Sequence, residues 1–161
     1  MSRGEVLAIV AASPARRLLG VLMLGGIGVL SISVAFFSPP ELVWQAFMIG
    51  MGIAGLWMAQ RMYAATQTQV ELTEEGLRDS TGQVIVPMDE IESIDRGMLA
   101  FKPSNGFLIR TKTQQSRRWQ PGLWWSMGRR IGIGGVTPGH QTKMMSDVIS
   151  AILLERDGAG G

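Results

Sequence analysis

Two apolar runs without a charged residue, residues 18–37 and 42–60, are separated by only four residues, 38–41. A helix rises about 1.5 Å per residue, so about 20 apolar residues cross the roughly 30 Å hydrocarbon layer of a bilayer. A helix also satisfies every backbone polar group there. The sequence therefore predicts a transmembrane hairpin of two helices over residues 18–60.

Basic residues beside these runs predict the orientation of the hairpin. Arg3, Arg16 and Arg17 precede the first run, Arg61 follows the second, and the connection has neither Lys nor Arg. Because Lys and Arg are retained on the cytoplasmic side, both termini are expected in the cytoplasm and the hairpin in the cytoplasmic membrane. A signal peptide would need a shorter apolar core and a small-x-small cleavage site, which residues 35–39 do not supply.

The composition suits a small membrane-anchored protein. The chain has 161 residues, of which 46% are hydrophobic and 17% charged. The chain beyond residue 60 is long enough for one compact domain. Cysteine is absent, which excludes disulfides, thiolate metal sites and thiol catalysis. The net charge of +2 does not by itself indicate a protein that binds nucleic acid.

The charges are unevenly distributed along the part of the chain that follows the hairpin. In residues 71–95 every charged residue except Arg78 is acidic. In residues 96–146 every charged residue is Lys or Arg. Such asymmetry can orient a domain near an anionic membrane. The alternative is that the acidic and basic halves pair with each other across a sheet.

Small residues within the two spans indicate close helix packing. Ala46, Gly50 and Ala54 form a row at spacing of four, which lets another helix approach closely. In the first span Gly25, Gly26 and Gly28 lack side chains and allow the same close approach. Residues 50–55 also match a dinucleotide-binding pattern, but they lie in an apolar run with no preceding strand, so helix packing is the better interpretation. The partner helix is the other half of the hairpin, a second copy or another protein.

After residue 61 the periodicity changes to the alternation of strands. Residues 67–72, 83–86, 107–112, 116–119 and 130–136 read as strands, with turns between them at residues 73–76, 80–82 and 102–106. Thr137 and Pro138 then suit the cap and first position of a helix. The apolar residues of that helix recur at helical spacing: Met144, Met145, Val148, Ile149, Ile152 and Leu153.

The two ends of the chain carry weaker signals. Residues 6–12 are apolar but too short to cross a bilayer, so they are expected either along the cytoplasmic membrane surface or as a disordered lead. The expected organisation is an N-terminal cytoplasmic segment (1–17), the hairpin (18–60), a mainly β domain of antiparallel strands closed by a C-terminal helix (66–156) and a disordered tail (157–161).

This arrangement resembles the bacterial membrane-anchored pleckstrin-homology-like (PH-like) proteins. The resemblance rests on residues 70–77, 87–91 and 131–135 before the last helix. It implies a PH-like fold over about residues 66–156 and a role in scaffolding, oligomerisation or complex assembly. PH domains that bind phosphoinositides use a basic loop between their first two strands. The equivalent turn here, residues 73–76, is acidic, so that site is not carried over.

The best functional candidate is a segment in which two arginine pairs bracket a tryptophan pair. Its candidate contact residues are Arg117, Arg118, Trp119, Trp124, Trp125, Arg129 and Arg130. Tryptophan prefers the membrane interface and arginine pairs with phosphate, so the segment is expected to be a loop that contacts lipid or protein. Alternatively, Trp124 and Trp125 cover the core while the arginines are solvated or pair with the acidic half. Binding of nucleic acid would need stacking aromatic residues along an accessible basic groove, and the membrane anchor offers no support for such a role.

Catalytic chemistry has little support in the sequence. His140 is the sole histidine and has no nearby carboxylate, and Asp89, Glu90 and Glu92 have no histidine beside them. Neither a nucleophile elbow nor a phosphate loop is present. We therefore expect no enzymatic activity, cofactor or metal.

The expected function is that of a non-enzymatic scaffold, or an assembly or accessory factor, for a membrane protein complex. Its partners would be the bilayer and either another membrane protein or a second copy of the chain, with no nucleic acid. The main alternative is a sensor of anionic lipid surfaces that acts through the Arg/Trp segment. A remote alternative is an accessory subunit of a transporter or respiratory enzyme.

Overall fold

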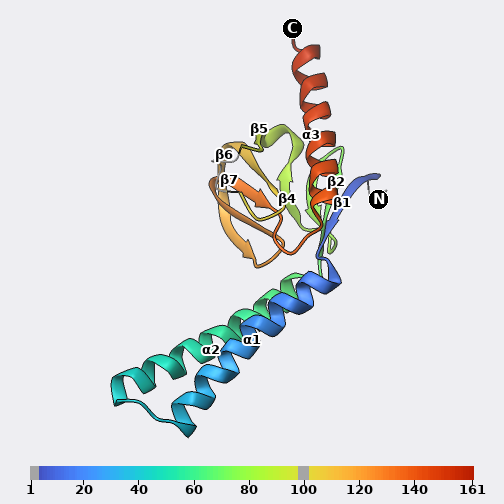
Figure 1. The fold of residues 1–161 in the computed structure, drawn as a ribbon. Coiled ribbons are helices and arrows are strands. Elements are labelled where there is room, and N and C mark those ends of the chain that lie inside the picture. The colour runs from blue at the N-terminus through green and yellow to red at the C-terminus, as the bar shows by residue number, and fades with distance from the viewer. Residues whose placement is uncertain (1–3, 98–101) are drawn as a thin grey trace.

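The computed structural model describes residues 4–97 and 102–161 of the chain, so Arg3 lies outside the described residues. Figure 1 shows a long helical hairpin that projects from a domain of curled strands, with one helix running along that domain. Two long apolar helices, antiparallel sheets and a C-terminal helix are thus all present, as the sequence predicts.

The hairpin consists of α1 (Pro14–Phe37) and α2 (Leu42–Ala65), each of 24 residues. At this length a helix is about 36 Å long, which exceeds the hydrocarbon layer. Pro14 opens α1, where its missing N–H costs no hydrogen bond. Only 11% of the most apolar window of each helix is buried within the protein, so the apolar side chains face outward. Both helices are long and apolar enough to cross a membrane.

The first sheet contains four antiparallel strands in the order β1 (Val6–Ala11), β2 (Gln69–Thr73), β3 (Gly76–Asp79) and β4 (Val84–Pro87). Residues 6–12, which the sequence suggested as a surface segment or a disordered lead, therefore provide strand β1. Val10 lies opposite Val70 of β2 and is fully buried. The strand forms because β2 supplies its hydrogen-bonding edge, and that partner lies about 60 residues away in the sequence.

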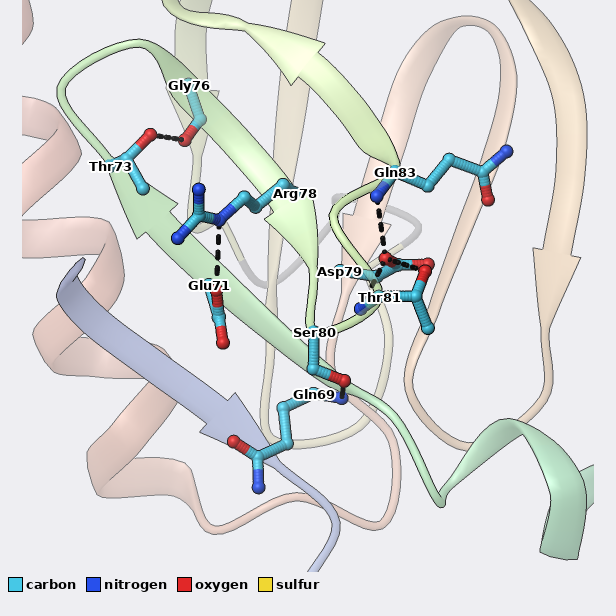
Figure 2. Close-up of polar contacts among 9 residues, drawn as sticks. All are labelled: Gln69, Glu71, Thr73, Gly76, Arg78, Asp79, Ser80, Thr81 and Gln83. Atoms are coloured by element: carbon cyan, nitrogen blue, oxygen red, sulfur yellow. Dashed lines mark hydrogen bonds and ion pairs between the residues drawn. The ribbon is translucent and has the colours of Figure 1, made fainter. Parts of the chain in front are cut away.

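Polar contacts close the turns of this sheet (Figure 2). The Thr73 hydroxyl donates to the Gly76 carbonyl oxygen at 3.1 Å, across the turn from β2 to β3. Between β3 and β4 the Asp79 carboxylate accepts hydrogen bonds from the backbone N–H groups of Thr81 (2.9 Å) and Gln83 (3.0 Å). At least one acidic side chain of this region, Asp79, therefore accepts hydrogen bonds within the sheet itself.

The second sheet contains β5 (Ile91–Asp95), β6 (Phe107–Gln120) and β7 (Trp124–Ile133) in that order, all antiparallel. A short 3₁₀ helix, η1 (Met88–Glu90), joins the two sheets. The sequence predicted two short strands, 107–112 and 116–119, where the structure has the single strand β6. Register shifts after Arg110 and Gln115 bend this strand while it stays paired with β7.

The helix α3 (Gly139–Ala159) covers one side of both sheets (Figure 1). Met145, Ile149 and Leu153 are buried in one core with residues of both sheets. The helix begins after Pro138, which is its N-cap. It continues to Ala159, so most of the tail predicted to be disordered is helical. Arg156 holds this end by donating to the Ile91 carbonyl oxygen at 2.9 Å.

The hairpin is inserted into the first sheet, because β1 precedes α1 and β2 follows α2. Residues 6–11 thus join the domain that was expected to begin at residue 66. The junction is tied by backbone and side-chain contacts: Ser13 N–H donates to the Val136 oxygen at 2.8 Å and Arg16 to the Thr137 oxygen at 3.0 Å. Both ends of the hairpin are therefore held by the same domain.

Candidate functional site

The Arg/Trp segment is a ribbon of two strands and not a loop. Trp119 near the end of β6 lies opposite Trp125 of β7, and Gln120 lies opposite Trp124. The turn between the strands is made by residues 121–123, where Gly122 adopts a φ of 81°, a conformation that glycine adopts without steric cost. The ribbon splits the seven candidate residues between an inward and an outward face, because side chains alternate along a strand.

The inward face serves the fold. Trp124 is buried in the core. The Arg118 guanidinium lies 5.1 Å from the centre of the Trp124 ring and donates to the carbonyl oxygens of Val84 (3.0 Å) and Ile85 (2.8 Å). These bonds tie the ribbon to β4 of the other sheet. Arg118 and Trp124 are therefore engaged within the domain, as the alternative interpretation of the segment expected for Trp124.

Arg129 is also engaged within the domain. It donates to the Thr111 carbonyl oxygen at 3.0 Å and lies 3.4 Å from a Glu92 carboxylate oxygen. Within the part of the chain that the structure describes, this is the one ion pair between the acidic and the basic halves. Both of its side chains are about half exposed, so the pair contributes little stability. Mutual neutralisation of the two halves is thus slight.

The outward face of the ribbon lines a hollow of about 740 Å³. It brings five of the seven candidate residues together with others that the sequence reasoning did not select. The lining residues are Lys102, Pro103, Arg117, Arg118, Trp119, Trp125, Ser126, Met127 and Arg130. Trp119 is 45% exposed and Met127 is 56% exposed. The hollow therefore combines basic groups with accessible apolar side chains.

Gly132 shapes this hollow. A Cβ atom at this position would collide with the Trp125 indole and would lie 2.9 Å from Cδ of Pro103. The Trp125 ring can therefore lie over β7 only because residue 132 has no side chain. The sequence contained this signal, a glycine between Ile131 and Ile133, but which side chain approaches it depends on the bend of the ribbon.

Two arginines of the hollow have no acidic partner in the part of the chain that the structure describes. Among residues 4–97 and 102–161, no carboxylate lies within ion-pair distance of Arg117 or Arg130. Both side chains belong to exposed residues and so remain hydrated. Arginine forms strong, charge-assisted bonds with carboxylates and phosphates, often through two parallel N–H groups. The hollow is therefore suited to an anionic group.

The tip of the ribbon lies against the domain end of the helical hairpin. A Cβ on Gly122 would lie 3.3 Å from the side chains of Met62 and Thr66, which are at the end of α2. Met62 in turn lies close to Gly20 of α1. In Figure 1 the hairpin leaves the domain obliquely toward the side that carries β6 and β7. The Arg/Trp ribbon is thus near the place where the chain enters the apolar helices.

The small residues of the hairpin fall into an inner and an outer set. The inner set makes the contact between the helices: a Cβ on Gly28 would lie 2.8 Å from the Gly52 carbonyl oxygen, and one on Gly55 would lie 3.2 Å from the Leu24 oxygen. The outer set is the predicted row, which is exposed: Ala46, Gly50 and Ala54. Gly50 has no neighbour within 4 Å of an added Cβ, and neither do Gly25 and Gly26. The predicted row is therefore not used within the hairpin.

The residues considered for catalysis are dispersed. His140 lies exposed at the start of α3. Glu90 accepts a hydrogen bond from the Thr113 hydroxyl at 2.6 Å, and Asp89 is exposed in η1. In the described residues there is no group of three or more His, Asp or Glu side chains that could hold a metal ion.

The chain was compared with protein-family models, curated proteins and solved structures, and none of the three comparisons gives a match. The site therefore has to be interpreted from its own geometry. That geometry offers two unengaged surfaces: the outer row of small residues on α2 and the basic, aromatic hollow on the β6–β7 ribbon.

Proposed function

We propose that this protein is a non-enzymatic, membrane-anchored scaffold or assembly factor for a membrane protein complex. The observation that carries the proposal is the outward direction of the Ala46, Gly50 and Ala54 row. Small residues allow helices in a bilayer to approach closely, and this row is not used by α1. A helix of another membrane protein is the partner that fits such a face.

We further propose that the sheet domain is a PH-like domain. Support comes from its four-stranded and three-stranded antiparallel sheets and from the single C-terminal helix that packs on both. The hairpin then interrupts this fold after its first strand. Insertion at this point ties the domain to the proposed membrane helices at two places, because β1 leads into α1 and β2 follows α2.

In the proposed topology the domain and both termini are cytoplasmic. Arg16, Arg17 and Arg61 lie at the domain end of the hairpin, whereas the connection at residues 38–41 has no basic residue. A phosphatase that is active only outside the cytoplasm, fused after Gly161, is expected to be inactive, and a fluorescent protein that matures only in the cytoplasm is expected to fluoresce. The reverse pair of signals would overturn the topology.

The assembly role is tested by the substitution Gly50→Leu. The leucine would hold a partner helix away from α2, so membrane proteins that co-purify with the wild-type chain in mild detergent should be lost. Gly50→Ala is the matched control, because alanine keeps the row small and should retain the partner. Membrane insertion and unfolding of the sheet domain should be unchanged in both variants, since a Cβ added at Gly50 meets nothing within 4 Å beyond its own chain neighbours.

Equal co-purification with Gly50→Leu and the wild type would show that Gly50 faces only lipid. The assembly role would then lose the observation on which it rests. A loss caused by Gly50→Ala as well would show that the effect comes from the helix itself and not from the contact.

A further inference from the structure

Two arginines from neighbouring strands and two tryptophans meet in the hollow on the outward face of the β6–β7 ribbon. We propose that this hollow binds the phosphate-bearing headgroup of an anionic membrane lipid. The inference deepens the proposed function, and it rests on the part of it that places the domain at the membrane surface.

The polar groups of the hollow fit a phosphate. Arg117 comes from β6 and Arg130 from β7, so the two guanidinium groups flank the hollow without a carboxylate partner in the described part of the chain. A guanidinium matches the geometry of a phosphate and is held less tightly by water than an ammonium group. A bound phosphate would replace the water that now solvates these two charges.

The apolar groups of the hollow indicate a lipid and not a freely soluble phosphate compound. Trp119 and Met127 are about half exposed beside the arginines, an arrangement that a hydrophilic ligand would leave in contact with water. Tryptophan favours the membrane interface because its ring is apolar and its N–H is polar. The ring can cover the glycerol and the upper acyl chain while the arginines hold the phosphate.

The position of the ribbon agrees with this assignment. Its tip at Gly122 contacts Met62 at the end of α2. Trp119 is two residues before Pro121, which places it within about 7 Å of the turn along the strand. The headgroup layer on each side of a bilayer is about 5–8 Å thick. A lipid beside the hairpin can therefore reach the hollow without leaving the membrane.

The test uses the full chain, because β1 precedes the hairpin and the domain cannot be cut away without losing a strand. The protein is purified in an uncharged detergent, and native mass spectrometry counts the lipids retained as phosphatidylglycerol or phosphatidylcholine is added. One phosphatidylglycerol should bind more tightly than all later ones. Phosphatidylcholine, whose phosphate is neutralised by its own ammonium group, should not occupy this tight site.

The double variant Arg117→Gln/Arg130→Gln should weaken the first phosphatidylglycerol by about thirtyfold, as expected for two basic residues at an anionic headgroup. The matched control is Lys112→Gln/Lys143→Gln, which removes the same charge from exposed positions outside the hollow and should leave the tight site intact. Thermal unfolding of both double variants should match the wild type, because none of the four side chains is buried.

Four outcomes would overturn the proposal. Equal weakening in both double variants would mean diffuse charge attraction, and equal binding of the two lipids would mean that charge is not recognised. Glycerol phosphate that displaces the lipid at an equal concentration would assign the hollow to a soluble phosphate compound. Retained lipid together with loss of a co-purifying protein in Arg117→Gln/Arg130→Gln would assign it to an acidic protein segment. Gly50→Leu should not alter lipid binding, so failure of the assembly role and failure of this inference are distinguishable.

Discussion

The helical hairpin and the sheet domain use apolar residues in opposite directions. Phe36 in α1 is 64% exposed, whereas Phe107 in β6 is 2% exposed. Outward apolar side chains suit contact with lipid, while inward ones gain free energy by leaving water. The chain thus contains two segments whose apolar side chains face in opposite directions. The comparison teaches that an apolar run alone does not define a core, because the surrounding solvent decides which face is buried.

Glycine also has different roles in the two regions. In the hairpin Gly28 and Gly52 let two backbones approach, and neither needs an unusual φ. In the domain Gly76 has a φ of 140° and Gly122 a φ of 81°, conformations that L side chains rarely adopt. Substitution by alanine would therefore push helices apart in the hairpin and strain turns in the domain.

The largest expected change in the free energy of unfolding distinguishes buried Phe107 from exposed Phe36. Phe107→Ala should lower the free energy of unfolding of the domain by about 3–5 kcal/mol, because it leaves a cavity in the core. Phe36→Ala should change it by less than about 0.5 kcal/mol, because its ring faces outward from α1. Denaturant unfolding of the full chain in detergent, followed by circular dichroism of the domain, measures both. Equal effects would mean that Phe36 is buried by a contact within the protein.

A smaller effect tests whether the chain before the hairpin belongs to the domain. Val10→Ala should cost about 2 kcal/mol, since a fully buried valine contributes about 1.5–3 kcal/mol to stability. Ile9→Ala is the control in the same strand, where the side chain is exposed and the expected loss is below about 0.5 kcal/mol. The same unfolding experiment distinguishes the two. If Val10→Ala is as mild as the control, residues 6–11 do not form a domain strand in solution.

The smallest effect concerns a turn of the domain. Asp79→Ala removes a carboxylate that accepts hydrogen bonds from the backbone of Thr81 and Gln83, and it should cost about 1–2 kcal/mol. Asp89→Ala is the matched control at an exposed aspartate in η1, with an expected change within about 0.5 kcal/mol. Hydrogen exchange should show faster loss of protection at residues 80–83 in Asp79→Ala only. Unchanged exchange there would show that the carboxylate does not hold the turn.

Local patterns predicted much of the fold. The two spans, the strand that starts at Phe107 and the amphipathic C-terminal helix follow from apolar runs and their spacing. Strand β1 could not be found in this way, because its six residues are stabilised by pairing with β2 beyond the whole hairpin. The continuous strand β6 was also missed, since its register shifts interrupt the regular alternation of side chains.

The candidate site was predicted in composition but not in arrangement. Arg117, Trp119, Trp125 and Arg130 line the hollow without a partner in the described part of the domain. Arg118 borders the hollow but donates to the Val84 carbonyl oxygen, and Trp124 and Arg129 are engaged within the domain. Neighbouring residues of a strand point to opposite faces, so a segment of mixed arginines and tryptophans divides as soon as it pairs. Met127 shares the face of Trp125 two residues away on β7, whereas Lys102 and Pro103 come from the segment before β6, and their place beside the ribbon is set by the tertiary structure.

The apolar length of the two helices and their flanking arginines are local properties, so the amino-acid sequence is enough to show that both helices suit a bilayer. Local patterns likewise predict that strands and a final helix follow. Three features became known only with the three-dimensional fold. The hairpin interrupts a sheet, certain small residues of α2 stay exposed, and Arg117 and Arg130 have no acidic partner among the described residues. Those features depend on contacts between distant residues, and their stability comes from burial and pairing that no local segment possesses.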